Sequence, residues 1–255
     1  MNSAEKVTRG SMPHWYKPGF AHFVTYRLAG SIPVAKVKAW RGQRRKQIQS
    51  AKGRSAANRE LRERAHKSFF ARYDEHLDRN AAVRWLQQPV VAEVVRENLY
   101  HHHGSRFELI AWCIMPNHVH VVLQPFESSI PLPVADAGSL GETTSISEDD
   151  VHSDEVRDSV SVLSRIMHSL KSYTANRANE VLNRSGSFWQ TESYDHWIRD
   201  VDELERIVDY VRLNPVKSGL CEQPQQWRYS SACERFQTDG STCGLVGWLR
   251  DDWRR

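Results

Sequence analysis

The sequence predicts an α+β fold built on an antiparallel sheet, and three observations carry this prediction. Segments typical of strands and helices follow one another in the order β-α-β-β-α-β-α. A short turn at Pro116-Asn117 joins two of the strands, as in an antiparallel hairpin. The composition, with 40% hydrophobic and 26% charged residues, is ordinary for a globular protein. We therefore expect a split βαβ sheet like that of ferredoxins or RNA-recognition motifs (RRM), with helices on one face and an additional C-terminal helix.

The first half of the chain supplies three strands and one apolar helix. Residues 21–30 alternate apolar and polar side chains and end at a glycine, which predicts a strand. Residues 81–102 repeat apolar positions at helical spacing, and Pro89 is expected to break or restart that helix. The runs 107–115 and 118–124 are the two strands of the hairpin.

The second half supplies two amphipathic helices around an extended segment. Residues 160–182 place most of their apolar side chains near one stripe, which predicts a helix, and residues 186–200 are expected to be extended. Asp200 is predicted to cap a last helix, with Glu203 completing a D-x-x-E pattern. We expect this helix to end at Asn214, because Pro215 follows.

Two segments of opposite charge interrupt this frame. Residues 36–67 hold twelve basic and two acidic residues, whereas residues 126–160 hold nine acidic residues and one arginine. The basic block can neutralise phosphates in a salt-sensitive way, although an arginine-rich solvated helix is the alternative. We interpret the acidic segment as a flexible insert that masks the positive charge of a nucleic-acid-binding protein. A further hypothesis is that this insert occupies the DNA-binding groove of the protein until DNA displaces it.

These segments set the expected domain division and location. We predict one domain over 1–225, with a basic insert at about 34–78 and an acidic insert at about 126–160, and a tail over 226–255. The longest apolar run has seven residues, far short of a membrane helix, and the N-terminus lacks a signal peptide. Four cysteines without a CxxC pair argue against a disulfide framework and a zinc ribbon. We expect a cytoplasmic, nucleoid-associated protein with no membrane partner.

The run MPNHVHVVLQ places two histidines side by side on the hairpin. Side chains alternate along a strand, so His118 and His120 share one face and Val119 and Val121 share the other. Two adjacent imidazoles backed by an apolar face suit the capture of one divalent metal ion. Two ordinary polar residues on a half-buried strand are the alternative.

The last helix carries a tyrosine and an asparagine four residues apart. Tyr210 and Asn214 therefore project from the same side of one turn. A tyrosine hydroxyl near a metal ion is a plausible nucleophile, and an asparagine oxygen is a plausible third ligand.

Four segments together resemble a known family. HFVTYRLAGSIP, AWCIMPNHVHVVLQP, FWQTESYDHWIRD and LERIVDYVRLNPVKSGL resemble, in this order, the REP-associated tyrosine transposases, within the wider family of single-tyrosine HUH (IS200-like) transposases. The resemblance covers nearly the whole chain outside the two inserts.

This resemblance implies a role for each matched residue. His118 and His120 match the two metal-binding histidines, Tyr210 the nucleophile, and Asn214 the polar residue that completes the metal site. The family implies an RRM-like sheet and Mg²⁺ or Mn²⁺ as cofactor, with no organic cofactor. It also implies cleavage of single-stranded DNA beside hairpins of palindromic repeats, through a 5′-phosphotyrosine intermediate, by a monomer or a homodimer.

Further residues are candidates for DNA contact, and Tyr194 is a rival nucleophile. Tyr194 is disfavoured because it falls in a predicted strand and matches no nucleophile position. The candidates for phosphate contact, each of which could instead be an ordinary solvated residue, are Arg44, Arg45, Lys46, Lys171, His196 and Arg199. Trp189 and Trp197 are candidate stacking platforms for bases.

Three functions remain open at this point. The leading hypothesis is a metal-dependent single-strand DNA endonuclease and strand transferase that acts through Tyr210. The alternatives are a domesticated hairpin-binding protein that no longer cuts, and a nickase like relaxases or replication initiators. The intact set of His118, His120, Tyr210 and Asn214 favours catalysis, and the 255 residues leave little room for the extra domains of a relaxase.

Overall fold

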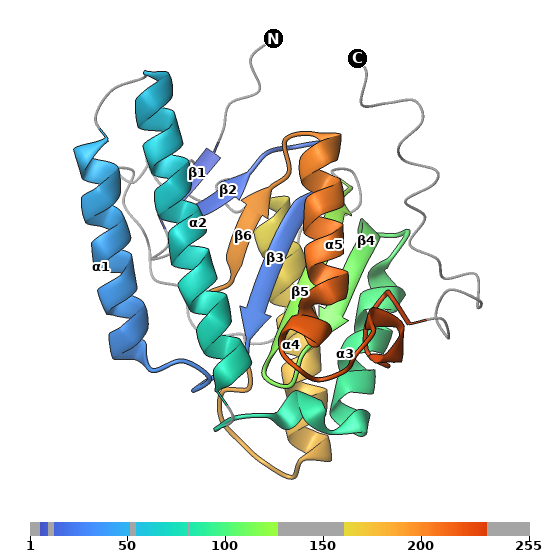
Figure 1. Ribbon diagram of the computed structural model, residues 1–255. Helices are drawn as coiled ribbons and strands as arrows, with labels where there is room; N and C mark the ends of the chain where they lie inside the picture. The colour runs from blue at the N-terminus through green and yellow to red at the C-terminus, as the bar shows by residue number, and fades with distance from the viewer. Residues whose placement is uncertain (1–5, 10–12, 52–54, 81, 127–160, 234–255) are drawn as a thin grey trace, which may run out of the picture.

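The computed structural model describes residues 6–9, 13–51, 55–80, 82–126 and 161–233 (Figure 1). The acidic segment, apart from Phe126, and most of the C-terminal tail lie outside these residues. The strands are β1 (Lys6–Arg9), β2 (Pro13–Tyr16), β3 (His22–Arg27), β4 (Phe107–Ile114), β5 (His118–Pro125) and β6 (Tyr194–Trp197). The helices are α1 (Val34–Ser50), α2 (Ala56–Arg79), α3 (Pro89–His102), α4 (Val162–Val181) and α5 (Val201–Lys217), with short 3₁₀ turns at Trp85–Gln87 and Pro224–Gln226.

The central sheet has four antiparallel strands in the order β4-β5-β3-β6. β3 lies between β5 and β6, and Thr25 of β3 pairs with His120 on one side and with Tyr194 on the other. β1 and β2 pair separately as a two-stranded sheet, which the sequence did not predict. The predicted α+β class with an antiparallel sheet is confirmed.

Each face of the sheet carries its own hydrophobic core. Val119, Val121 and Leu123 of β5 pack with α3 and α4 on one face, and the alternate residue Val122 packs with α2 and α5 on the other. Figure 1 shows α2 and α5 in front of the sheet and α4 behind it. α3 and α4 are thus the expected helices on one face, and α5 is the expected additional helix. We call the face under α2 and α5 the histidine face, because His118 and His120 lie on it.

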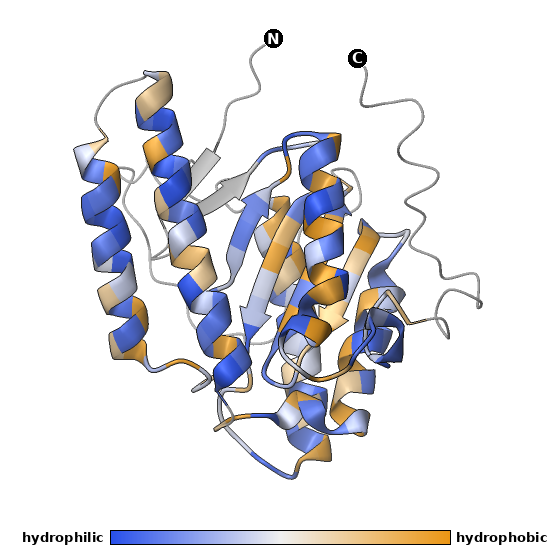
Figure 2. Ribbon diagram, viewed as in Figure 1, coloured by the Kyte–Doolittle hydropathy of each residue, from blue (hydrophilic) through white to orange (hydrophobic). Residues whose placement is uncertain are grey.

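The basic segment forms a pair of long helices. α1 and α2 pack against each other, and Figure 2 shows that both are hydrophilic over most of their length. The apolar residues of α2 lie on one stripe, where Phe69, Tyr73 and Leu77 are buried against the histidine face. α2 is therefore a structural part of this face and more than a solvated charged helix.

The boundaries of two helices differ from those predicted. Pro215 does not end the last helix, because α5 continues to Lys217 and Pro215 is itself buried in the core. A proline removes one backbone N–H bond and its ring crowds the carbonyl four residues earlier, and the burial of Pro215 in the core offsets this cost near the end of the helix. Pro89 occupies the first turn of α3, so the predicted helix 81–102 begins only there.

The buried face of α4 differs from the apolar stripe predicted over 160–182, because it continues through Thr174 and Ala178. Tyr173 and Val181 of α4 are largely exposed, whereas Leu163, Ile166 and Leu170 are buried.

Among the described helices, none combines the length and the apolar character needed to cross a membrane.

Candidate active site

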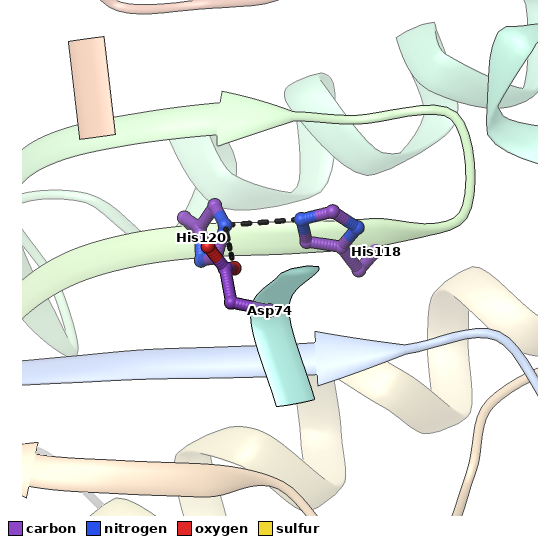
Figure 3. Close-up of side chains that lie close together, drawn as sticks. All are labelled: Asp74, His118 and His120. Carbon is purple, nitrogen blue, oxygen red and sulfur yellow. Dashed lines mark hydrogen bonds and ion pairs between the residues drawn. The ribbon is translucent and has the colours of Figure 1, made fainter. Parts of the chain in front are cut away.

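The structure brings the two histidines of β5 into direct contact on the histidine face. Both imidazoles are fully buried, and their Nε2 atoms lie 3.0 Å apart. Their side chains extend toward α2 from the same side of the strand (Figure 3). The prediction that the alternation of side chains places both rings on one face of the sheet is therefore correct.

The protonation of His118 is set by its neighbour Asn117. The Asn117 amide nitrogen donates to the backbone carbonyls of Leu77 (2.8 Å) and Asn80 (2.9 Å). This orientation directs the Asn117 oxygen at His118 Nδ1, 2.7 Å away, so that Nδ1 must carry the proton and donate it. The Nε2 atom of neutral His118 is then an acceptor with its lone pair directed at His120.

His120 is held in a similar way from its outer side. Its Nδ1 atom lies 2.8 Å from the hydroxyl of Thr25, its cross-strand partner on β3. The ring of Phe23 stacks on it at 5.6 Å between centroids. In both histidines the Nδ1 atom thus has an oxygen partner, and the two Nε2 atoms are directed at one point. This arrangement is typical of metal-bound histidines.

A third ligand-type group, Asp74, comes from α2. One of its carboxylate oxygens, Oδ1, lies 3.3 Å from His120 Nε2 (Figure 3). One atom each of Asp74, His118 and His120 fall within 4.8 Å of one another. Asp74 was not predicted from the sequence, because it lies in the segment that was interpreted only by its positive charge.

Tyr210 of α5 completes the group. Its hydroxyl donates a hydrogen bond to the other oxygen of Asp74, Oδ2, and accepts one from Asn214 Nδ2 at 3.2 Å. The tyrosine ring packs edge-on to His120 at 5.5 Å between centroids. Tyr210, Asn214, His118 and His120 are thus brought together, as the sequence analysis expected.

Burial governs the electrostatics of these residues. Burial and the neighbouring His120 lower the pKa of His118 well below its usual value, so the ring is neutral at pH 7. Burial alone would raise the pKa of Asp74, but the hydrogen bond and charge of His120, together with the hydrogen bond from Tyr210, outweigh it and the pKa is lowered. Burial and the negative charge of Asp74 raise the pKa of Tyr210, so its hydroxyl keeps its proton at neutral pH.

The donor set fits a divalent cation. Two imidazole nitrogens and one carboxylate are ligands that Mn²⁺ and similar ions accept. The oxygen of the buried Asn214 side chain, Oδ1, has no hydrogen-bond partner among the described residues, and an orphaned buried oxygen is costly unless a ligand or water meets it. The described residues thus contain a histidine and aspartate group that could hold a metal ion.

Three of the candidate DNA contacts lie at the β6 side of the histidine face. Arg44 is buried against the ring of Phe69, at 4.6 Å from its centroid. His196 lies 3.1 Å from Glu203, and Arg199 pairs with both Glu203 and Glu63. These three side chains are part of the packing of α1, α2 and α5, whereas Arg45 and Lys46 are exposed on α1.

Lys171 and Trp189 belong to the opposite face of the sheet. The ammonium group of Lys171 donates to the carbonyls of Gln190 and Thr191, both at 2.6 Å, and burial lowers its pKa to about 8. Trp189 is buried in the core under α4, and its indole donates to Thr174 at 2.9 Å. Neither residue is brought to the paired histidines. The hypothesis that Trp189 is a stacking platform is wrong in placing it near the site, because its ring fills the core of the other face.

Tyr194 lies on the histidine face but away from the metal-binding group. Its ring packs on Phe70 at 4.5 Å and on Phe23 at 6.3 Å between centroids. Burial raises its pKa as well, beside the charge of Asp195. Its place is thus in an aromatic cluster next to the site.

An antiparallel sheet with two imidazoles at its centre and a tyrosine on the covering helix has the features of the HUH class that the motifs resemble.

Two curated relatives confirm the family resemblance. The chain is 29% identical over 125 residues to a protein of Haemophilus influenzae provisionally named REP-associated tyrosine transposase, and the match covers 49% of this chain and 58% of that protein. It is 22% identical over 125 residues to the REP-associated tyrosine transposase of Escherichia coli K12, covering 49% and 54%. The chain is therefore related to this family.

The matches do not extend over whole proteins. The chain spans little more than half the length of these curated relatives. No family model matches the chain. A solved structure of a REP-associated tyrosine transposase bound to a REP hairpin is similar at a TM-score of 0.44 and 15% identity, over 89% of this chain and 84% of that one.

Proposed function

We propose that this protein is a metal-dependent endonuclease and strand transferase for single-stranded DNA, a transposase of the HUH type. The observation that carries the proposal is the convergence of Tyr210, Asp74, His118 and His120, from three separate elements, on one buried point. A purely structural core would not bring four polar groups to this point, because removing each of them from water costs free energy.

In the proposed reaction Tyr210 is the nucleophile and Asp74 receives its proton. The tyrosine oxygen attacks the scissile phosphorus, the bond from phosphorus to the 3′ oxygen breaks, and the 3′ oxygen leaves as a hydroxyl by taking a proton from water, whose hydroxide then takes the proton that Asp74 received. The Tyr210 proton moves along the hydrogen bond to Asp74 Oδ2, while the Asn214 amide holds the hydroxyl in place. The 5′-phosphotyrosine keeps the energy of the phosphodiester, so a second 3′-hydroxyl can reverse the step and join strands.

The residues that would hold the cation are His118 and His120, with Asn214 or the Oδ1 atom of Asp74 as the oxygen ligand. When bound, Mg²⁺ or Mn²⁺ supplies positive charge that polarises the phosphate and stabilises the pentavalent transition state. Asn117 and Thr25 orient the two imidazoles for this task.

The substrate that we propose is DNA beside a hairpin of a palindromic repeat. The support is the family of the two relatives, both REP-associated tyrosine transposases. The exposed bases Arg45 and Lys46 on α1 are proposed to contact DNA phosphates. We further propose a single domain over 1–225 and a cytoplasmic, nucleoid-associated protein that acts as a monomer or a homodimer.

A covalent-adduct assay tests the proposal. The protein is incubated with Mn²⁺ and an end-labelled single strand that carries a hairpin, and the products are run on a denaturing protein gel. We expect a labelled adduct that EDTA prevents, that Tyr210→Phe abolishes and that Tyr194→Phe retains. Tyr194→Phe is the matched control, because it removes one buried hydroxyl from the same face without touching Asp74.

Two results would contradict the proposal. An adduct of equal yield in both variants would exclude Tyr210 as the nucleophile. Tight hairpin binding without any adduct would favour the domesticated DNA-binding protein.

A further inference from the structure

A small polar pocket adjoins the candidate active site at the hairpin end of the sheet. It encloses about 200 Å³ and is lined by the end of α2 and the segment after it, by the β4–β5 turn, and by the segment that follows α5. His118 lines this pocket and also belongs to the metal-binding group. A strand of DNA whose phosphate lies at His118 therefore places a neighbouring nucleotide at the pocket.

The two helices extend the polar row of the active site into the pocket. Asp74 and Asp78 lie one turn apart on α2, and Ser218, the residue that caps the C-terminus of α5, follows Asn214 by four positions. α2 and α5 run in the same direction in front of the sheet (Figure 1). Asp78 and Ser218 are thus the next polar pair after Asp74 and Asn214, and both line the pocket.

The polar atoms of this pair face each other in the pocket. The Ser218 hydroxyl interacts with the Asp78 carboxyl, and the buried Oδ1 atom of Asp78 receives no hydrogen bond from any other described residue. A buried carboxylate oxygen without a donor costs free energy, which a ligand carrying N–H groups would recover. Arg79 and Arg84 line the same pocket and offer positive charge for the sugar-phosphate chain of such a ligand.

The volume limits what can enter. Drug-sized ligands occupy pockets of roughly 300–1,000 Å³, and one water occupies about 30 Å³. A space of about 200 Å³ suits one planar heterocycle. Its apolar side is lined by Leu220 and by the edges of the almost fully buried Leu77 and Met115.

We propose that this pocket, here called the Asp78 pocket, binds one nucleobase of the DNA strand, within two nucleotides of the scissile phosphate, and that Asp78 accepts hydrogen bonds from the exocyclic amino group of that base. The inference rests on the proposed function, because it requires single-stranded DNA at His118. Thymine carries no exocyclic amino group, so the pocket selects against thymine at this one position.

The test measures binding in the absence of divalent metal, so that cleavage plays no part. Fluorescence anisotropy gives the affinity for a hairpin oligonucleotide in which each nucleotide near the cleavage point is replaced in turn by thymidine or by an abasic residue. We expect a loss of about tenfold for either replacement at one position within two nucleotides of the scissile phosphate, and little change elsewhere. Asp78→Asn is expected to reduce the discrimination against thymine to less than about twofold while the abasic strand binds as before.

Asp209→Asn is the matched control, because it removes one carboxylate of the same size from an exposed position of α5. This variant is expected to keep the discrimination of the natural chain. Equal affinity for all replaced strands, or discrimination that survives Asp78→Asn, would overturn the inference while the adduct assay still reports on Tyr210. Failure of the natural chain to bind the hairpin would instead overturn the proposed function itself.

Discussion

Asn117 offers the sharpest test of how the histidine pair is prepared. Its side chain makes three hydrogen bonds, to the carbonyls of Leu77 and Asn80 and to His118 Nδ1, at 2.7 to 2.9 Å. Asn117→Ala leaves all three partners without this bond, and each lost bond costs about 1 kcal/mol. We expect the free energy of unfolding, measured by urea denaturation, to fall by about 3 kcal/mol.

The same substitution should weaken metal binding separately from stability. Without the Asn117 oxygen, the proton of His118 is no longer held on Nδ1 and can move to Nε2. A protonated Nε2 has no lone pair with which to bind a cation. Loss of such a supporting partner lowers metal affinity by roughly 10- to 100-fold. Calorimetric titration of the folded protein with Mn²⁺ measures this change.

Asn179→Ala on α4 is the control for Asn117→Ala. The Asn179 side chain also bonds on both sides, to the Gly186 carbonyl and to Arg184, but it is only half-buried and lies on α4, which packs on the opposite face of the sheet from the histidines. We expect it to leave the Mn²⁺ affinity unchanged. If Asn117→Ala also kept the affinity of the natural chain, the argument that Asn117 sets the tautomer of His118 would be refuted.

Three further predictions concern charge. Hydrogen bonds from His196 and Arg199 outweigh the effect of burial and lower the pKa of Glu203 to about 2, so its carboxylate stabilises the fold above about pH 4.5 and this contribution is lost as the pH falls through 2. Glu203→Gln should therefore cost about 2 kcal/mol at pH 7, a value reduced for the partial exposure of Arg199, and the difference should shrink below pH 4 in urea titrations; a pH-independent difference would contradict this. Replacing Arg45 and Lys46 by alanine should reduce the slope of log K against log salt by about 1.4 for a single-stranded oligonucleotide, and an unchanged slope would remove both from the DNA contact. Deleting 127–158, which carry all nine acidic residues of the insert, should raise DNA affinity at low salt, and unchanged affinity would dispose of the masking hypothesis.

Local rules of the chain determined the sheet and the identity of most residues that meet in the site. Alternation along β5 assigned His118 and His120 to one face, and the helical repeat put Tyr210 and Asn214 on one side of α5, because both periods depend only on backbone geometry. The cap of α5 followed from sequence as well, since Asp200 accepts from the backbone N–H of Glu203 at 2.7 Å. The Glu203 side chain, however, accepts from the backbone N–H of Arg199, one residue before the cap.

Only the tertiary structure decided which helices cover the histidines and what they add. Asp74 reaches Tyr210 from 136 positions away in the sequence, and nothing in the charge pattern of α2 distinguishes it from the other acidic residues there. The placement of α2 depends on the packing of Phe69, Tyr73 and Leu77 against the sheet, an interaction between distant segments that no local period encodes. For the same reason the sequence could not exclude Lys171 and Trp189 from the site, because a helix pattern identifies an apolar side but not the face of the sheet on which it packs.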